Sequence, residues 1–263
     1  DLVNRAVGIV YDDRGSGAVP IVCLHGIGGN TDSFREQLTG LSDQHRVIAW
    51  NMPGYGGSDM IDPLTFPELA AKLVEFLQSL GIEKAHLAGQ SIGGMVALEA
   101  ACLYPEMVAT LTMIGATSAF GGRDDSFKDQ FIAARLEPLD AGMTIAELAN
   151  KFVPEIVGPS ASAGAITCAT DSMAAVPQET YREIIRCLVT FNRRADIETL
   201  PMPVCLIAGE VDQNSPDKTM ARMAEKIPNA EYHEIKGAGH LINLEAGDKT
   251  NVILSNFLAK HGA

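Results

Sequence analysis

The stretch "HLAGQSIGGMVALEA", residues 86–100, joins a short apolar run to a helix-like pattern through a serine with glycines on both sides. Glycine weakens strands and helices, so each glycine here needs a geometric reason. We interpret the motif Gly89-Gln90-Ser91-Ile92-Gly93 as a sharp turn from a strand into a helix. Such a turn lifts the serine hydroxyl above the sheet edge, beside the positive end of the helix. The motif therefore predicts that Ser91 is a nucleophile, against the alternative of a tight structural turn.

Apolar runs alternate with helix-like stretches along much of the chain. Most of the runs are apolar throughout, which is typical of strands that are covered on both faces. Between two of them, residues 65–81 repeat apolar side chains at helical spacing, with Thr65 as N-cap and Gly81 at the C-terminal end. The alternation predicts an α/β fold: a mostly parallel sheet with helices on both faces. The predicted strands cover residues 19–25, 46–52, 84–89, 108–115, 203–209 and 230–235.

The alternation stops in residues 118–199, which show no convincing strand pattern and are too long for a loop. Three helix-like stretches within this segment predict a helical insertion, at 126–139, 143–153 and 178–194. Residues 1–117 and 200–263 then form one core. A last helix within residues 243–262 is predicted to carry its apolar side chains on one side: Val252, Ile253, Phe257 and Leu258.

A serine needs a base to remove its proton, and the chain has six histidines. His240 lies in the glycine-rich stretch "KGAGHL", between a predicted strand and the last helix, where a loop can place an imidazole over the sheet edge. His86 and His233 fall within predicted strands, and a structural role suits them better. We therefore predict that His240 is the base.

The base in turn needs an acid that orients its ring. Asp212 lies in the turn directly after the strand 203–209, and Glu210 lies closer to the strand end. We favour Asp212 and keep Glu210 as the alternative. The resulting order along the chain, serine then aspartate then histidine, is typical of one class of serine hydrolases.

The stretch "LHGIGGN", residues 24–30, follows a predicted strand and offers backbone N–H groups with little side-chain obstruction. An oxyanion hole needs two such donors aimed at the developing negative charge. We assign the amides of Ile27, in this stretch, and Ile92, directly after the serine. His25 is interpreted as a residue that braces the loop.

Taken together, "LHGIGG", "MPGYGGSD", "GQSIGG", "AGEVDQNSP" and "GAGH" resemble the α/β-hydrolase superfamily over essentially the whole chain. Within it, the chain is most similar to 3-oxoadipate enol-lactonases and small carboxylesterases. The resemblance implies a helical cap after the sixth strand and a structural turn at residues 52–59. The sequence departs from the family pattern at Asn51, where many relatives have aspartate, and this departure leaves the subfamily open. A lactone that bears a carboxylate would need a cationic partner. The cap region offers six arginines, among which the sequence does not choose: Arg123, Arg135, Arg182, Arg186, Arg193 and Arg194.

The expected activity is hydrolysis of a small ester or lactone through an acyl-enzyme, with no cofactor and no metal. One alternative is a C–C bond hydrolase acting on meta-ring-cleavage products, because the same three side chains serve that reaction. The other is a hydrolase-fold receptor that senses a small molecule. The acyl group, the leaving group and the oligomeric state stay open.

Charge, hydropathy and cysteine content indicate which partners and which cellular compartment to expect. The formal net charge of -13 disfavours nucleic acid and anionic membranes, since both would be repelled. No stretch approaches the length of a membrane span, and the first residues do not resemble a signal peptide. Five cysteines without a C-x-x-C pair fit no complete disulfide framework, so a cytoplasmic protein is expected.

Overall fold

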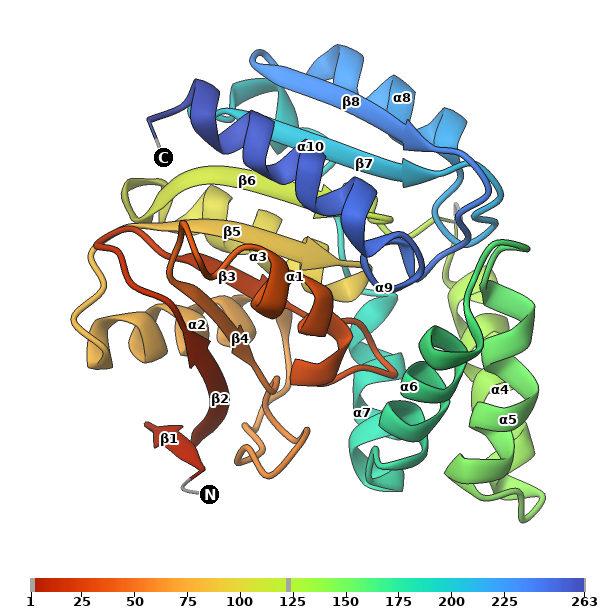
Figure 1. The fold of residues 1–263 in the computed structure, drawn as a ribbon. Helices are drawn as coiled ribbons and strands as arrows, with labels where there is room; N and C mark the ends of the chain where they lie inside the picture. The colour runs from red at the N-terminus through yellow and green to blue at the C-terminus, as the bar shows by residue number, and fades with distance from the viewer. Residues whose placement is uncertain (1–2, 122–123, 263) are drawn as a thin grey trace.

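The computed structural model describes residues 3–121 and 124–262. Its centre is an eight-stranded sheet with the order β1-β2-β4-β3-β5-β6-β7-β8 (Figure 1). β2 pairs antiparallel with both β1 and β4, and the strands from β4 to β8 in this order run parallel to one another. The strands are β1 (Asn4–Ala6), β2 (Ile9–Arg14), β3 (Ile21–Leu24), β4 (Val47–Trp50), β5 (Ala85–Gln90), β6 (Val108–Ile114), β7 (Val204–Gly209) and β8 (Ala230–Ile235).

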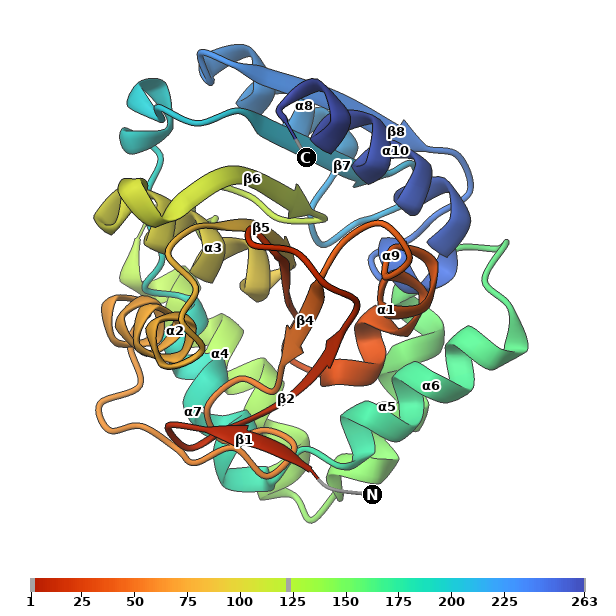
Figure 2. The same ribbon diagram turned by 60° about the vertical axis from the view of Figure 1, so that its left-hand side comes forward.

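Helices cover both faces of the sheet. Every residue of β3, β4, β5 and β7 is buried, because apolar side chains alternate between two helical layers. One layer contains α1 (Arg35–Gly40) and α10 (Gly247–Lys260), and the other contains α2 (Phe66–Ser79), α3 (Ile92–Leu103) and α8 (Asp217–Lys226) (Figures 1 and 2). The predicted α/β architecture is confirmed. Shorter helices complete the core: η1 (Thr31–Phe34), η2 (Pro105–Met107), η3 (Asp196–Thr199) and α9 (Ile242–Glu245).

The cap is inserted between β6 and β7, as expected for a cap after the sixth strand. It contains α4 (Asp125–Asp140), α5 (Ile145–Ile156), α6 (Ala163–Ala174) and α7 (Gln178–Leu188), and it lies beside the carboxyl ends of the central strands (Figure 1). The sequence predicted three of these helices and missed α6, whose many small residues carry little amphipathic pattern. Where the cap begins and ends along the chain stays the prediction of residues 118–199.

The helix α2 shows how local sequence sets an element's ends. The Thr65 hydroxyl accepts a hydrogen bond from the Glu68 amide at 3.3 Å, and Gly81 takes the left-handed conformation at φ +71° just after the helix. Both ends of the predicted helix are therefore confirmed.

The predicted apolar face of the last helix is partly wrong. In α10 the side chains of Leu254, Phe257 and Leu258 are buried at helical spacing, whereas Val252 is 59% exposed. Val252 precedes Phe257 by five residues, which places it on a different side of the helix. The buried stripe therefore runs through Leu254, and Ile253 lies at its margin.

In the described part of the chain, no helix combines the length and apolar character that crossing a bilayer would require.

Candidate active site

Ser91 occupies the turn between β5 and α3 with φ +55° and ψ -125°. A residue with a side chain seldom adopts a positive φ, and such strain persists only when the surroundings enforce it. Here the Ser91 amide donates to the Ile114 carbonyl of β6 at 2.9 Å, and the first turn of α3 begins at the next residue. The turn therefore presents the hydroxyl at the carboxyl end of the sheet.

The two glycines of the motif and Gly94, which follows it, are required by close approaches of neighbouring atoms. A Cβ atom at Gly89 would overlap the Gly93 carbonyl, and one at Gly93 would overlap the Leu24 carbonyl. At Gly94 a Cβ atom would lie 2.6 Å from the Cβ of Ala116. Any larger residue would push the helix away from the strand and open the turn.

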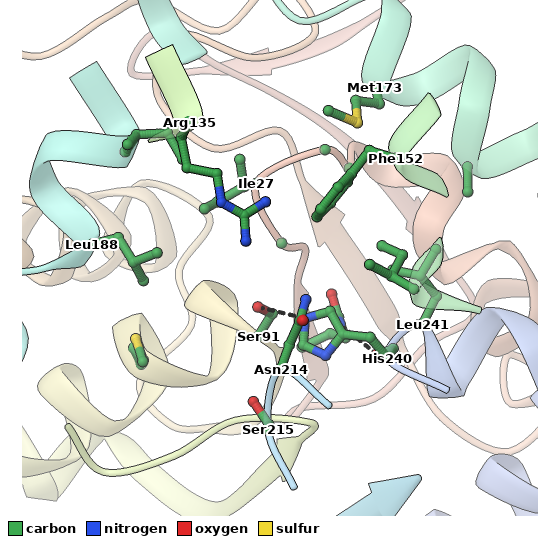
Figure 3. A pocket seen from close by; sticks show the side chains of 18 of the residues that line it. Ile27, Ser91, Arg135, Phe152, Met173, Leu188, Asn214, Ser215, His240 and Leu241 are labelled. Carbon is green, nitrogen blue, oxygen red and sulfur yellow. Dashed lines mark hydrogen bonds between the residues drawn. The ribbon is translucent and has the colours of Figure 1, made fainter. Parts of the chain in front are cut away.

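Ser91, His240 and Asp212 are joined by two hydrogen bonds. The His240 Nε2 lies 3.0 Å from the Ser91 Oγ (Figure 3). On the other side of the ring, the His240 Nδ1 lies 2.9 Å from the Asp212 Oδ2. The other Asp212 oxygen accepts hydrogen bonds from the amides of Asn214 and Ser215, at 2.9 and 3.1 Å. Both Asp212 and His240 are buried, so water competes little for these contacts. The three residues predicted from the sequence are thus brought together.

Glu210, the alternative acid, points elsewhere. Its carboxylate pairs with the exposed Lys236 ammonium at 3.0 Å, and this interaction lowers the pKa of Glu210. Asp212 is the carboxylate that contacts His240.

The predicted oxyanion loop lies beside the serine. A Cβ atom at Gly26 would sit 3.3 Å from the Ser91 Cβ, and the next residue, Ile27, lines the same cavity as Ser91. Ile92 is fully buried at the start of α3. Among the turn, loop and cap hydrogen bonds of the described residues, neither the Ile27 amide nor the Ile92 amide is a donor. Ile92 is the first residue of α3, a position whose amide has no acceptor within the helix.

His25 holds this loop in place. Its Nε2 accepts from the Met52 amide at 3.0 Å, so the Nδ1 carries the proton and donates to the Gly26 carbonyl at 2.7 Å. Complete burial lowers the pKa of His25 to about 4, which keeps the ring neutral. From the cap, the Ser172 hydroxyl also donates to the Gly28 carbonyl at 2.8 Å.

Two residues that the sequence did not point to hold the His240 loop. The buried Gln90 side chain donates to the His240 carbonyl at 2.8 Å. The Glu245 carboxylate accepts from three amides: Gly239 at 3.0 Å, Leu241 at 2.9 Å and Gly158 of the cap at 2.6 Å. A glutamate five residues after a histidine carries no local signal, since its partners become visible only when the cap is folded.

A cavity of about 410 Å³ opens above Ser91, between the core and the cap. Most of its wall is apolar, and Arg135 of α4 extends into it (Figure 3). The Arg135 guanidinium lies 5.0 Å from the ring centre of Phe131 and 4.8 Å from that of Phe152. Other side chains that line the cavity include Ile27, Val153, Met173, Tyr181, Leu188 and Leu241.

The structure distinguishes Arg135 from the other cap arginines. Arg193 pairs through two nitrogens with the buried Glu99, which raises its pKa, and so joins the cap to α3. Arg182 pairs with Asp140, Arg186 lies near Glu183, and Arg194 is exposed. Arg123 lies outside the described residues. Among the described residues, no carboxylate pairs with Arg135.

The Asn51 side chain forms hydrogen bonds with two backbone groups. Its side-chain oxygen accepts from the Thr31 amide at 3.1 Å, and its amide group donates to the Gly56 carbonyl at 3.4 Å. Asn51 therefore links the turn at residues 52–59 to the start of η1, a structural role.

Comparison with known protein families gives one clear match. The model of the family described as the alpha/beta hydrolase fold matches residues 19–247. Enol-lactonase relatives are among the similar sequences: 3-oxoadipate enol-lactonase 1 from Acinetobacter baylyi is 27% identical, over 92% of this chain and 89% of its own length. A 2-hydroxy-6-oxononadienedioate/2-hydroxy-6-oxononatrienedioate hydrolase from a Pseudomonas species is 28% identical, over 98% of this chain and 93% of its own.

Other relatives are longer than this chain. The dihydrolipoyllysine-residue acetyltransferase component of the acetoin cleaving system from Pseudomonas putida is 30% identical over 95% of this chain. The chain spans 66% of that protein, and 12% of a polyketide synthase from Burkholderia thailandensis that is 28% identical.

Solved structures share the fold. A thermophilic esterase from Thermogutta terrifontis superposes with a TM-score of 0.87 at 24% identity, covering 99% of this chain and 97% of its own. The enol-lactonase from Burkholderia xenovorans gives a TM-score of 0.84 at 20% identity, covering 95% and 96%.

Proposed function

The chain belongs to the α/β-hydrolase superfamily, and we propose that it is a serine hydrolase that cleaves a small ester or lactone through an acyl-enzyme. One observation carries the proposal: two hydrogen bonds connect Asp212 through His240 to Ser91, and Ser91 lines the cavity. Nucleophile, base, orienting acid and candidate oxyanion donors all come from this chain, so the reaction needs no cofactor.

The geometry supports a two-stage reaction. His240 takes the Ser91 proton as the serine oxygen attacks the carbonyl carbon, and the negative charge on the carbonyl oxygen is received by the amides of Ile27 and Ile92. The protonated His240, stabilised by Asp212, gives its proton to the departing alkoxide or enolate. His240 then removes a proton from water, which attacks the acyl carbon. As the bond between the acyl carbon and the Ser91 oxygen breaks, His240 returns the proton to that oxygen, and the carboxylic acid product leaves.

The cavity wall favours a substrate that bears a carboxylate. Arg135 places a positive charge in an otherwise mostly apolar cavity, close to two aromatic rings. A guanidinium in such surroundings binds a planar anion through two parallel hydrogen bonds. We therefore favour a small ester or lactone with a carboxylate on its acyl or leaving part, in line with the resemblance to enol-lactonases.

The same geometry also serves C–C bond hydrolysis, and the relative named as a 2-hydroxy-6-oxononadienedioate hydrolase is the observation that favours this second candidate. Turnover of an enol-lactone, an aryl ester and a ring-fission product would rank the two activities. Very slow turnover of all three, together with ligand-dependent binding of a partner, would instead indicate a receptor.

Labelling with a fluorophosphonate tests the nucleophile. We expect one equivalent of label on the wild-type protein at Ser91, and none on Ser91→Ala, which should fold normally and lose turnover of p-nitrophenyl acetate. Ser215→Ala is the matched control, because Ser215 also lines the cavity but does not contact His240. Full labelling or retained turnover in Ser91→Ala would refute the proposal.

Arg135→Met tests the substrate class. We expect kcat/KM to fall about 10- to 100-fold for an ester that bears a carboxylate, the usual loss for a hydrogen bond to a charged group. The neutral ester of the same length should be affected little. Arg182→Met, which removes a cap arginine that pairs with Asp140, is the control. Equal losses for both esters would show that Arg135 shapes the cavity and does not recognise charge.

A further inference from the structure

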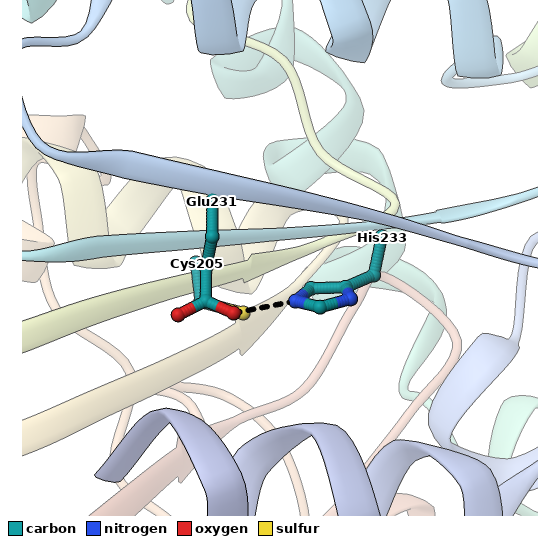
Figure 4. Close-up of side chains that lie close together, drawn as sticks. All are labelled: Cys205, Glu231 and His233. Carbon is teal, nitrogen blue, oxygen red and sulfur yellow. Dashed lines mark hydrogen bonds and ion pairs between the residues drawn. The ribbon is translucent and has the colours of Figure 1, made fainter. Parts of the chain in front are cut away.

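A second group of reactive side chains lies on the sheet face that α10 covers (Figure 4). Cys205 belongs to β7 and faces Glu231 of β8 in the parallel register. His233 is two residues beyond Glu231, so both side chains point to the same face. Glu231 and His233 of β8 and Cys205 of β7 therefore bring their side chains together on this face.

The three side chains offer one sulfur, one oxygen and one nitrogen. These ligand atoms lie within 4.8 Å of one another, and the His233 Nε2 is 2.6 Å from the Glu231 Oε2. Tetrahedral Zn²⁺ would separate such ligands by about 3.3–3.6 Å, given its bond lengths to sulfur, nitrogen and oxygen. Shifts of about 1 Å would therefore complete the geometry.

We propose that Cys205, Glu231 and His233 form a binding site for Zn²⁺ or a similar divalent transition-metal ion, with water in the fourth position. A mixed set of thiolate, imidazole and carboxylate suits Zn²⁺ and disfavours Mg²⁺ and Ca²⁺, which prefer oxygen ligands alone. On binding, the Cys205 sulfur gives its proton to solvent and coordinates as the thiolate. Cys205 is fully buried, whereas Glu231 and His233 are half-buried, so the ion would enter from the side of β8.

One of the three proposed ligands, Glu231, already pairs with a positive charge. The Lys260 ammonium, at the end of α10, lies 3.3 and 3.4 Å from the two oxygens of Glu231. The Lys260 side chain is 60% exposed, so it can turn into solvent when a metal ion arrives. Lys260 is therefore a competitor of the metal and not a ligand.

The metal site is separate from the candidate active site. Cys205 is the second residue of β7, whereas Asp212 follows the carboxyl end of that strand. Because β8 is the edge strand, a metal shared by β7 and β8 would fasten the sheet edge. The site can thus be tested without measuring hydrolysis, and its failure would leave the proposed function untouched.

Co²⁺ is the probe, since thiolate coordination produces a sulfur-to-cobalt charge-transfer band in the near ultraviolet. Titration of the wild-type protein with Co²⁺ should produce this band with one equivalent bound, and Zn²⁺ should remove it by displacement. Cys205→Ser should lose the band, and Cys168→Ser, which removes a cysteine outside the site, should keep it.

Two variants on the exposed side provide evidence even if Cys205→Ser fails to fold. His233→Gln should weaken Co²⁺ binding at least about tenfold through loss of a ligand. Lys260→Met should strengthen it about two- to fivefold, the usual worth of a surface ion pair. Absence of the band in the wild type, its loss in Cys168→Ser, or unchanged affinity in both His233→Gln and Lys260→Met would overturn the proposal.

Discussion

Asp212 determines which ring nitrogen of His240 carries the proton. With one carboxylate oxygen held by the amides of Asn214 and Ser215, the other is fixed toward the His240 Nδ1 at 2.9 Å. A proton on Nδ1 leaves the Nε2 lone pair facing the Ser91 hydroxyl. The aspartate therefore selects the one imidazole tautomer that can act as a base.

We expect Asp212→Asn to lower kcat for an aryl ester by about 10³- to 10⁴-fold, because an amide can donate to Nδ1 and hold the wrong tautomer. Glu210→Gln is the matched control, since Glu210 follows the same strand but pairs with Lys236. It should retain wild-type kcat. A large loss in Glu210→Gln with a small loss in Asp212→Asn would reverse the assignment of the acid.

Individual site residues could be predicted from the sequence where a nearby motif or the end of a predicted strand marks their position. Ser91 lies within its glycine motif, and Asp212 and His240 each lie in a loop directly after a strand. Arg135 carries no such signal, because which side of α4 faces the cavity depends on how the whole cap packs. The weak amphipathic pattern of α4 left that choice open.

The junction between the cap and the His240 loop connects the cap to the site through several hydrogen bonds. The His240 amide donates to the Ile156 carbonyl at the end of α5 at 2.7 Å, and Glu245 binds amides on both sides of the junction. The backbones also touch closely, since a Cβ atom at Gly239 would lie 2.5 Å from the Gly158 nitrogen. Displacement of the end of α5 would therefore displace His240.

Glu245→Gln should lower kcat about tenfold and leave KM nearly unchanged, since the amide keeps one accepting oxygen but loses the charge that strengthens these bonds. Glu245→Ala should lower kcat further. In both variants the low-field NMR signal of the proton between His240 and Asp212 should shift or broaden. Glu225→Gln, on α8, is the control. An unchanged NMR signal combined with a lower melting temperature would indicate a role in stability alone.

Elements with strong periodicity were predictable, and weakly patterned ones were not. α2 has both a capping threonine and a buried stripe, so its ends and its face agree with the prediction. α6 is rich in small residues and packs against α5 and η1, and small residues give little contrast between buried and exposed faces. In α10, an exposed valine next to the buried stripe misled the assignment of its face.

For the molecule as a whole, two buried histidines make stability depend on pH. Burial lowers the pKa of both His25 and His86 to about 4. His25 braces the oxyanion loop, and the His86 Nδ1 lies 2.8 Å from the Thr110 hydroxyl between two central strands. In an unfolded chain a histidine has a pKa near 6.5. Between about pH 6.5 and pH 4 the unfolded chain therefore binds protons that the folded chain does not.

The contribution of these two histidines to the free energy of unfolding should therefore be fully present above pH 6.5 and should decrease as the pH is lowered toward 4. For His25 the loss between pH 7 and pH 5 should be about 2 kcal/mol. This pH range separates the histidines from Glu210 and Glu231. The pKa values of these two carboxyls are lowered from 4.5, so their contributions to the free energy of unfolding are lost only in more acidic solution.

Urea unfolding at pH 7 and pH 5 measures the effect. His25→Gln should reduce the difference in unfolding free energy between the two pH values by about 2 kcal/mol, even if it lowers stability at both. His261→Gln, near the end of the chain, is the control. An equal pH difference in the wild type and His25→Gln would mean that His25 is protonated in the folded protein, and the neutral brace of the oxyanion loop would then be wrong.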